Sequence, residues 1–149
     1  MKTNDLKPIA VHPHEGKILD SLGVQNKLTS QHTGSAIYLF ESEFGPGNGN
    51  RLHVHRYEDE VAYVLQGAMA VRLGDQNLEI HTGGVAFLPK GIPHALRNPS
   101  TTSSRYLFAA IPGGYLEYWF EAIEAAEEGS LDDGAYQALS LKYGIEWLE

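Results

Sequence analysis

The sequence predicts an all-β fold, a sandwich or barrel, that ends in two short α-helices. About seven to nine short segments rich in β-branched and aromatic residues are separated at regular intervals by Gly, Pro and Asn turns. The hydrophobic period changes to that of a helix only after Gly114. Because no helix separates successive strands before that point, a parallel α/β sheet is excluded.

The chain has 149 residues, the length of one ordinary domain. We expect a single domain over 1–149, with an N-terminal arm and edge strands in 1–34. The barrel core is expected in 35–111 and a C-terminal helical segment in 115–149. The first part is polar and broken by Pro and Gly, so it is expected to form one or two short edge strands at most.

Composition restricts the partners. The chain carries 11 Lys and Arg against 19 Asp and Glu, a formal charge of −8, and its basic residues are scattered, which argues against nucleic-acid binding. It has no cysteine, so any metal site must use histidine and carboxylate. The sequence contains neither a secretory leader nor an apolar run long enough to span a membrane, and we expect a cytoplasmic protein.

The core strands follow from local composition and turn residues. A strand over 35–44 precedes a loop rich in Gly and Asn, and a tight polar turn at 74–77 indicates a hairpin. The further strands are expected at 61–65, 68–73, 78–81, 85–88, 94–98 and 105–111.

Two of these strands, Val61–Leu65 and Tyr106–Ile111, are apolar at successive positions. Both faces of such strands must be covered. We expect the barrel interior on one face and either the C-terminal helices or a second subunit on the other. A homodimer is therefore predicted.

The C-terminal segment has helical periodicity. Apolar residues recur at i, i+3, i+4 and i+7 over 115–128, with glutamates between them. Asp132 or Asp133 can cap a second helix over 134–143, and Gly144 can end it in the left-handed conformation. The aromatic residues of these helices are interpreted as packing rather than as cofactor contacts.

The stretch from Gly47 to Gly67 contains a candidate metal site. His53 and His55 are two apart, so in a strand they point to the same side. If the strand continued unbroken, Asp59 would join them. If a turn or bulge lies between, Glu60 would face the ion instead. The residues alone leave both possibilities open.

The remaining histidines are interpreted as surface or strand residues without a ligand role. Pro13 separates His12 from His14 and cannot donate to a strand ladder, while His32 and His81 stand alone.

Two motifs resemble those of the cupin superfamily. The first consists of Gly47, five residues, His53-Val54-His55, four residues, Glu60, six residues and Gly67. The second consists of Gly83, five residues, Pro89-Lys90-Gly91, two residues, His94, three residues and Asn98. The flanks, Thr33-Gly34 and 112–120, are similar to small bacterial cupins labelled quercetin-dioxygenase-like.

The resemblance implies a double-stranded β-helix, or cupin jelly-roll barrel. It implies one divalent transition metal, Fe, Mn, Ni, Cu or Zn, held by His53, His55, Glu60 and His94. It also favours Glu60 over Asp59 and gives Glu60 a catalytic role as a proton carrier.

The function expected from the resemblance is a metal-dependent dioxygenase acting on a small phenolic or enediol-like compound. The alternatives are an isomerase or lyase of a small hydroxy- or keto-compound and a non-catalytic small-molecule-binding protein. An oxygenase of aromatic compounds needs an apolar cavity, which Phe40, Met69, Phe87 and Phe108 would provide if they face inward. A sugar isomerase would need Arg, Lys or Asn there.

Overall fold

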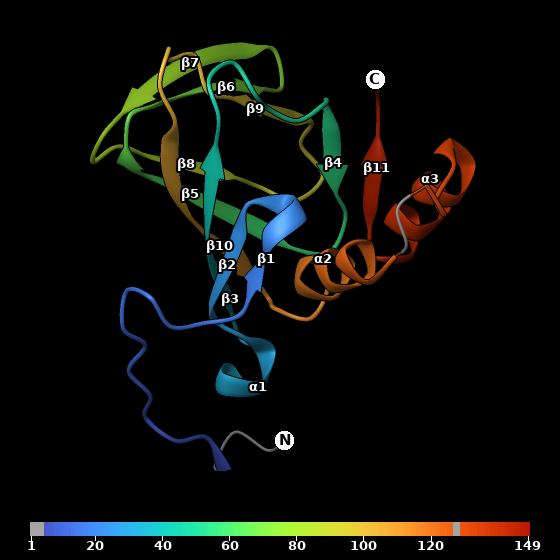
Figure 1. The fold of residues 1–149 in the computed structure, drawn as a ribbon. Coiled ribbons are helices and arrows are strands. Elements are labelled where there is room, and N and C mark those ends of the chain that lie inside the picture. Colours follow the sequence, from blue (N-terminus) through green and yellow to red (C-terminus); the bar gives the residue numbers. More distant parts are fainter. Residues whose placement is uncertain (1–4, 127–128) are drawn as a thin grey trace.

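Two antiparallel sheets form the body of the protein in a computed structural model, which describes residues 5–126 and 129–149 (Figure 1). The six-stranded sheet has the order β1 (Ile18–Leu19), β2 (Val24–Leu28), β3 (Tyr38–Phe44), β10 (Ser104–Ile111), β5 (Asp59–Gln66) and β8 (Val85–Leu88). The five-stranded sheet has the order β11 (Ile145–Trp147), β4 (His53–His55), β9 (His94–Arg97), β6 (Ala68–Leu73) and β7 (Gln76–His81). The predicted all-β jelly-roll fold is confirmed.

The inner face of the six-stranded sheet carries much of the core. Along β3, Tyr38 and Phe40 are buried, and the half-buried Leu39 between them faces outward, as the two-residue period of a strand requires. Phe40 lies directly opposite Phe108 of β10, and their rings stack with centroids 5.2 Å apart. Each aromatic side chain thus buries its surface against a partner from the neighbouring strand.

The two C-terminal helices, α2 (Leu116–Ala125) and α3 (Asp133–Lys142), match the predicted positions closely. The chain also forms a short helix, α1 (Ser30–Thr33), and a 3-10 turn at Asp20–Leu22. Asp132 caps α3 by accepting a hydrogen bond from the Ala135 amide at 2.8 Å. Gly144 follows α3 with a φ of 81°, as expected for its stop. The prediction for 115–128 includes residues 127 and 128, which lie outside the described residues, and α1 was not predicted.

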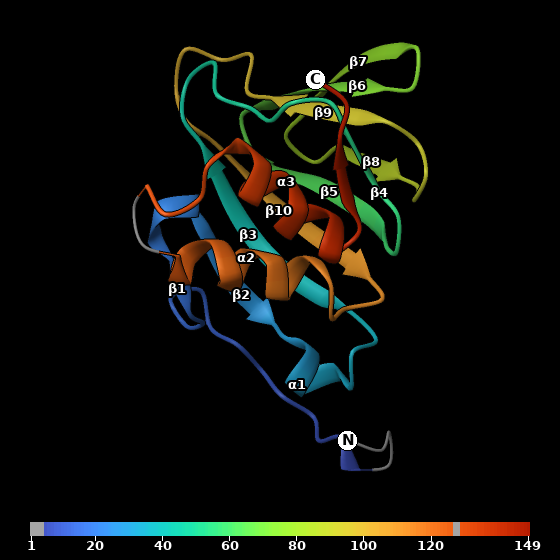
Figure 2. The same ribbon diagram turned by 90° about the vertical axis from the view of Figure 1, so that its right-hand side faces the viewer.

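The C-terminal segment closes one side of the barrel. In Figure 2, α2 and α3 lie in front of β3 and β10, and β11 forms the edge of the five-stranded sheet. β11 (Ile145–Trp147) pairs with β4. The sequence does not predict the strand β11. No helix in the described ranges, 5–126 and 129–149, is long and apolar enough to cross a membrane.

The helices do not cover the outer face of β5 and β8. Tyr63, Val85 and Phe87 are 40%, 59% and 57% exposed on that face, so of the two expected covers for strand 61–65, the C-terminal helices or a second subunit, the helices are not the one found at Tyr63. Because α2 packs through Phe120 against Phe40 on the inner face, this part of the outer face is left exposed in one chain.

Asn98 ties the loop after β3 to the loop between β9 and β10. Its amide nitrogen lies 2.8–3.1 Å from the carbonyl oxygens of Phe44, Gly45 and Thr102, and its side-chain oxygen accepts from Ser100 and Ser104. Asn98 is fully buried. Removal of its side chain would leave several buried polar groups without partners.

We therefore expect Asn98→Ala to lower the free energy of unfolding by roughly 2–4 kcal/mol, the cost of several buried polar groups left unpaired. Urea unfolding followed by circular dichroism measures this. Asn77→Ala, at an exposed position of strand β7, is the matched control and should change stability by less than about 0.5 kcal/mol. Equal stability of the two variants would contradict the role of Asn98.

Candidate metal centre

Three histidines meet between β4 and β9. His53 and His55 point to one side of β4, and His94 lies directly opposite His53 in the antiparallel pair. The ring centroids of His53 and His94 are 4.4 Å apart, and those of His55 and His94 are 5.3 Å apart. All three side chains are buried, and one ring nitrogen of each lies within 4.8 Å of those of the others.

Glu60, not Asp59, faces these histidines. The chain turns between β4 and β5, which resets the alternation of side chains before Glu60. The Glu60 Oε1 atom lies 2.6 Å from His55 Nε2 in the barrel interior. Asp59 points away and accepts a hydrogen bond from the Lys90 amide at 2.9 Å. The structure therefore follows the second of the two predicted possibilities.

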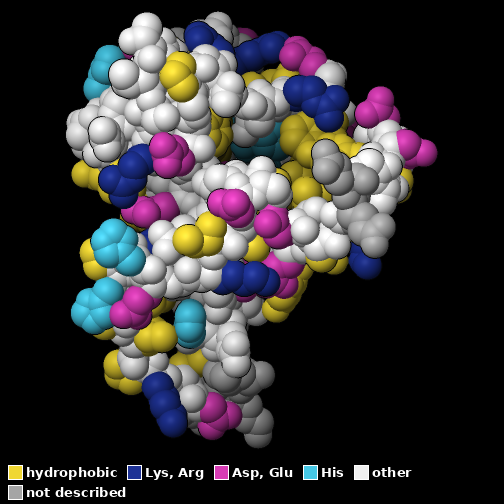
Figure 3. Space-filling model, in the orientation of Figure 1, with side chains coloured by type: hydrophobic (Ala, Val, Ile, Leu, Met, Phe, Trp, Pro, Cys, Tyr) yellow, Lys and Arg dark blue, Asp and Glu magenta, His cyan; other side chains and the backbone are white. Residues whose placement is uncertain are grey.

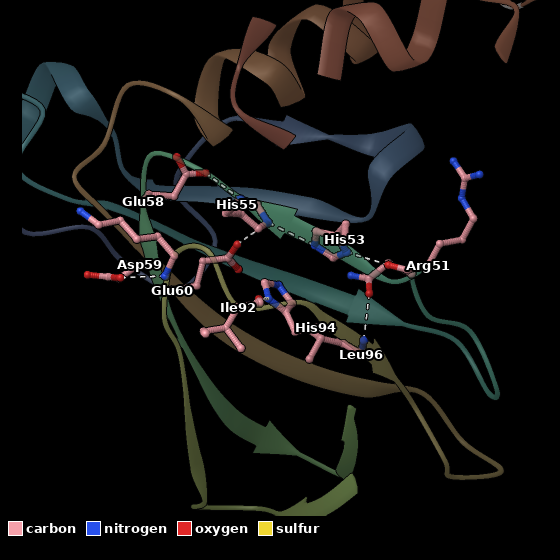
Figure 4. A network of polar contacts seen from close by, with 11 residues as sticks. Arg51, His53, His55, Glu58, Asp59, Glu60, Ile92, His94 and Leu96 are labelled. Atoms are coloured by element: carbon pink, nitrogen blue, oxygen red, sulfur yellow. Dashed lines mark hydrogen bonds and ion pairs between the residues drawn. The ribbon is translucent and has the colours of Figure 1, made fainter. Parts of the chain in front are cut away.

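Each imidazole is oriented by its other ring nitrogen (Figure 4). His53 Nδ1 lies 2.6 Å from the Arg51 carbonyl, and His94 Nδ1 lies 3.4 Å from the Ile92 carbonyl. His55 Nδ1 lies 2.8 Å from Glu58 Oε1. Because these acceptors favour a proton on Nδ1, the Nε2 lone pairs are left for the interior.

Several buried polar atoms here have no hydrogen-bond partner among the described residues. They are His94 Nε2, Glu60 Oε1 and Glu58 Oε2. Although Glu60 Oε1 is close to His55 Nε2, the contact lacks hydrogen-bond geometry. Buried polar atoms of this kind are costly unless an ion or a partner satisfies them. The cluster of three imidazoles and one carboxylate fits a divalent transition metal, which would satisfy the Nε2 atoms and Glu60 together.

The pKa values in the cluster show which protons a metal must displace. Burial, with the neighbouring His94 and His55, lowers the pKa of His53 to about 3, and burial also lowers that of His94. Burial opposes charge on His55, but Glu60 and Glu58 outweigh it and raise its pKa to about 10. Burial alone would raise the pKa of Glu60, but His55 and the other histidines lower it to about 2. Two neutral imidazoles and an ionised carboxylate are thus available to a cation.

Glu58 is a site residue that the sequence analysis missed. It is fully buried in the turn after β4, and its carboxylate holds His55 from behind. Burial raises its own pKa. The available signal was an acidic residue three positions after His55, a predicted metal ligand, since metal-binding histidines commonly donate to a carboxylate.

The cluster opens into a cavity of about 330 Å³. Figure 3 shows the hollow, with a histidine inside it and hydrophobic side chains along its rim. Phe40 and Phe108 line the cavity as predicted. Met69 is buried elsewhere, and Phe87 points outward with 57% of its surface exposed, so the prediction is wrong for these two residues.

The histidines outside the cluster are on or near the surface. His12, His14 and His81 are exposed. His32 is half-buried, and its ring accepts a hydrogen bond from the Thr29 amide at the start of α1. These positions agree with the interpretation that none of the four belongs to the site.

Comparison with known proteins identifies the family. The family model described as a cupin domain matches residues 40–110, which include His53, His55, Glu60 and His94. The solved protein TT1209 of Thermus thermophilus is 31% identical over 54% of this chain and 76% of its own, with a TM-score of 0.51.

The chain belongs to the cupin superfamily. A protein of Thermotoga maritima described as a predicted oxalate decarboxylase shares the cupin fold, with 23% identity, a TM-score of 0.57 and coverage of 60% of this chain and 78% of its own. The polyketide synthase protein TcmJ of Streptomyces glaucescens is 24% identical over 86 residues, 57% of this chain. The chain spans 58% and 59% of the two curated relatives that it matches. The finer resemblance to quercetin-dioxygenase-like cupins stays a prediction.

We predict that His94→Ala lowers the bound metal per chain to less than about a tenth of the wild-type value, because it removes one imidazole from a buried donor set. Asp59→Asn should leave metal content unchanged, since Asp59 faces Lys90. Inductively coupled plasma mass spectrometry of protein loaded with Mn, Fe, Ni, Cu or Zn measures both.

Glu58→Gln should weaken metal affinity by about 10–100-fold while leaving the ligand atoms in place. Equal metal content in wild type and in the His53→Ala/His94→Ala double variant would exclude a metal at this cluster.

Proposed function

We propose that this cupin binds one divalent transition metal through His53, His55, Glu60 and His94. We propose that it acts in the cytoplasm as a dioxygenase of a small phenolic or enediol-like compound. The observation that carries the proposal is the combination of this donor set with a cavity lined mainly by aromatic and aliphatic side chains. Fe, Mn, Ni, Cu and Zn all accept such a set.

The four protein donors leave one or two positions of a five- or six-coordinate ion for other ligands. When bound, a transition metal supplies Lewis acidity to a substrate hydroxyl and makes its reaction with dioxygen feasible. The aliphatic and aromatic walls exclude water from the reacting atoms. Both atoms of dioxygen would be incorporated into the organic product.

Glu60 is the group that would accept the substrate hydroxyl proton. It is the one carboxylate among the proposed ligands, and the proximity of His55 keeps its pKa low and its oxygen ionised at neutral pH. Its Oε1 atom lies inside the cavity wall without a hydrogen-bond partner among the described residues. A hydroxyl held at the same point would lie within reach of this oxygen, as a general base requires.

The cavity lining favours an oxygenase over a sugar isomerase. No Lys or Arg is found among the lining residues of the described chain. Asn50 lines the cavity, but its side-chain oxygen already accepts a hydrogen bond from the Leu96 amide at 2.9 Å. A polyhydroxylated substrate would therefore find few polar partners away from the metal cluster.

We expect Glu60→Gln to lower the turnover number by roughly 10²–10⁴-fold, the usual contribution of a positioned general base. The loss in metal content should be much smaller. His94→Ala should lose both together. An oxygen electrode with metal-loaded protein and a panel of catechols and flavonols measures turnover, and Glu79→Gln, an exposed strand residue, is the control.

An anaerobic assay of the same mixtures separates the possible chemistries. Turnover that proceeds equally without dioxygen would exclude the dioxygenase and support an isomerase or lyase. Tight binding without turnover under either atmosphere would support a binding protein.

We also propose that the protein is a homodimer joined through the outer face of β5, β8 and β10. Residues directly opposite one another across these strands share this face. Its central residues carry no charge; they are Val61, Tyr63, Leu65, Val85, Phe87, Leu107, Ala109 and Ile111. Because each copy has a formal charge of −8, an uncharged face is where two copies approach with the least repulsion.

The exposed area of this face is sufficient for a modest interface. Tyr63, Val85, Phe87 and Ile111 are 40–59% exposed, which amounts to roughly 300–500 Å² per copy if a large side chain offers about 150–250 Å². Two copies together approach the roughly 1,000 Å² expected of a biological interface. None of the eight residues named for this face lines the cavity, so such a dimer would not use the cavity wall.

Light scattering at micromolar concentration should give about twice the chain mass of 16.4 kDa. Phe87→Glu places a charge on the exposed edge strand of the face and should raise the dissociation constant by at least about tenfold. Leu78→Glu is the matched control, because Leu78 is a 46% exposed strand residue of the other sheet. A mass of 16.4 kDa at all concentrations would contradict the dimer.

A further inference from the structure

Both tryptophans of the chain lie in the wall of the metal cavity. Trp119 comes from α2 and Trp147 from β11, and Tyr136 of α3 joins them. The ring centroids of Trp119 and Trp147 are 6.3 Å apart, and Tyr136 is 5.8 Å from Trp147 in a stacked arrangement. We call these three residues the aromatic wall. The sequence predicts that the aromatic residues of the helices pack in the core. In the structure, Trp119 and Tyr136 also line the cavity.

One hydroxyl group fixes the aromatic wall. The indole Nε1 atoms of Trp119 and Trp147 both donate to Ser140 Oγ, at 3.1 and 3.0 Å. Ser140 Oγ in turn donates to the Tyr136 carbonyl at 2.8 Å, and the residue is fully buried. A serine hydroxyl can accept two hydrogen bonds and donate one, so all of its capacity is used.

This arrangement determines what the cavity presents to a ligand. Because both indole N–H groups are satisfied by Ser140, they are not available to bind a polar molecule. Away from the histidines and Glu60, the cavity presents ring surfaces from the aromatic wall and from Phe40 and Phe108, with uncharged polar groups at Ser21, Ser42, Asn50 and Tyr136. Such surfaces bind planar rings by stacking, and the lining, among the described residues, offers no Lys or Arg to a small dicarboxylate.

The aromatic wall starts beside the metal cluster. The Trp147 ring centroid lies 5.0 Å from that of His53, because β11 pairs with β4 and places Trp147 opposite His53. A cavity of about 150 Å³ is known to hold benzene. The present volume of about 330 Å³ therefore suits a molecule of one or two rings whose hydroxyl groups reach the histidines.

We propose that the aromatic wall is the ring-binding subsite of the cavity and that Ser140 is the residue that positions it. On this proposal, which rests on the proposed function, the substrate class is a planar one- or two-ring aromatic with adjacent hydroxyl groups. A non-aromatic enediol is excluded as the preferred ligand.

Matched ligands test this proposal directly. Catechol and 2,3-dihydroxynaphthalene carry adjacent hydroxyls on planar rings, and cyclohexane-1,2-diol carries them on a saturated ring. We expect calorimetry with metal-loaded protein to show at least about tenfold tighter binding of the aromatic diols than of the saturated one. Since both tryptophans lie in the wall, the same titration should shift the intrinsic fluorescence.

Variants separate positioning from simple stability. Ser140→Ala and Trp147→Leu should each reduce the preference for the aromatic diols by roughly fivefold or more, through weaker aromatic binding and a higher KM with little change in kcat. Ser103→Ala, at an exposed serine, should leave the preference unchanged. If Ser140→Ala fails to fold, Trp147→Phe is used instead, because it keeps a ring but loses the N–H donor. The same reduced preference for aromatic over saturated diols is expected of it.

The outcomes distinguish this proposal from the proposed function. Preferential aromatic binding without oxygen consumption would leave the ring subsite standing while the dioxygenase fails. Oxygen consumption with a non-aromatic enediol, unaffected by Ser140→Ala and Trp147→Leu, would overturn the subsite while the dioxygenase stands. Equal affinity of the wild type for catechol and cyclohexane-1,2-diol would also overturn it.

Discussion

The pairing of β4 with β9 is the contact on which the site depends. It sets His53 directly opposite His94, although the two residues belong to separate motifs of the chain. Only a strand pair with a fixed register holds two side chains this closely, since a slip of one residue would turn every side chain to the other face. The loops that Asn98 ties together flank this pair and hold its register.

The outward-facing ring nitrogens of the three histidines have hydrogen-bond partners, whereas some inward-facing atoms of the cluster have none among the described residues. The outward nitrogen of each imidazole has an acceptor, from Arg51, Glu58 or Ile92. The inward atoms of His94 and Glu60 have none among the described residues. A buried arrangement of this kind is costly by itself, and a cation at its centre would turn that cost into binding free energy. The backbone carbonyls and the buried carboxylate hold the imidazoles in the orientation that metal binding would require.

The C-terminal segment contributes to the site through its edge strand. Because β11 pairs with β4, the residue opposite His53 is Trp147, so the metal cluster and the aromatic wall share one pair of strands. The helices then cover the opening, and one buried hydroxyl, that of Ser140, holds both indoles. The uncharged outer face of the sheet lies away from this side, so a partner subunit and a ligand would not compete for the same surface.

The sequence by itself determined the fold class, most strand positions, the cap at Asp132 and, through two family motifs, the four residues that meet in the cluster. These features depend on local period and spacing. Strand alternation alone left Asp59 and Glu60 both open; the motifs favoured Glu60, and the turn after β4, which resets the alternation of side chains, gives the physical reason. Tertiary structure alone decided the role of Glu58, the pairing of β11 and the exposure of Phe87. Each of these depends on which distant segment lies alongside, and neither hydrophobic period nor turn chemistry encodes that choice.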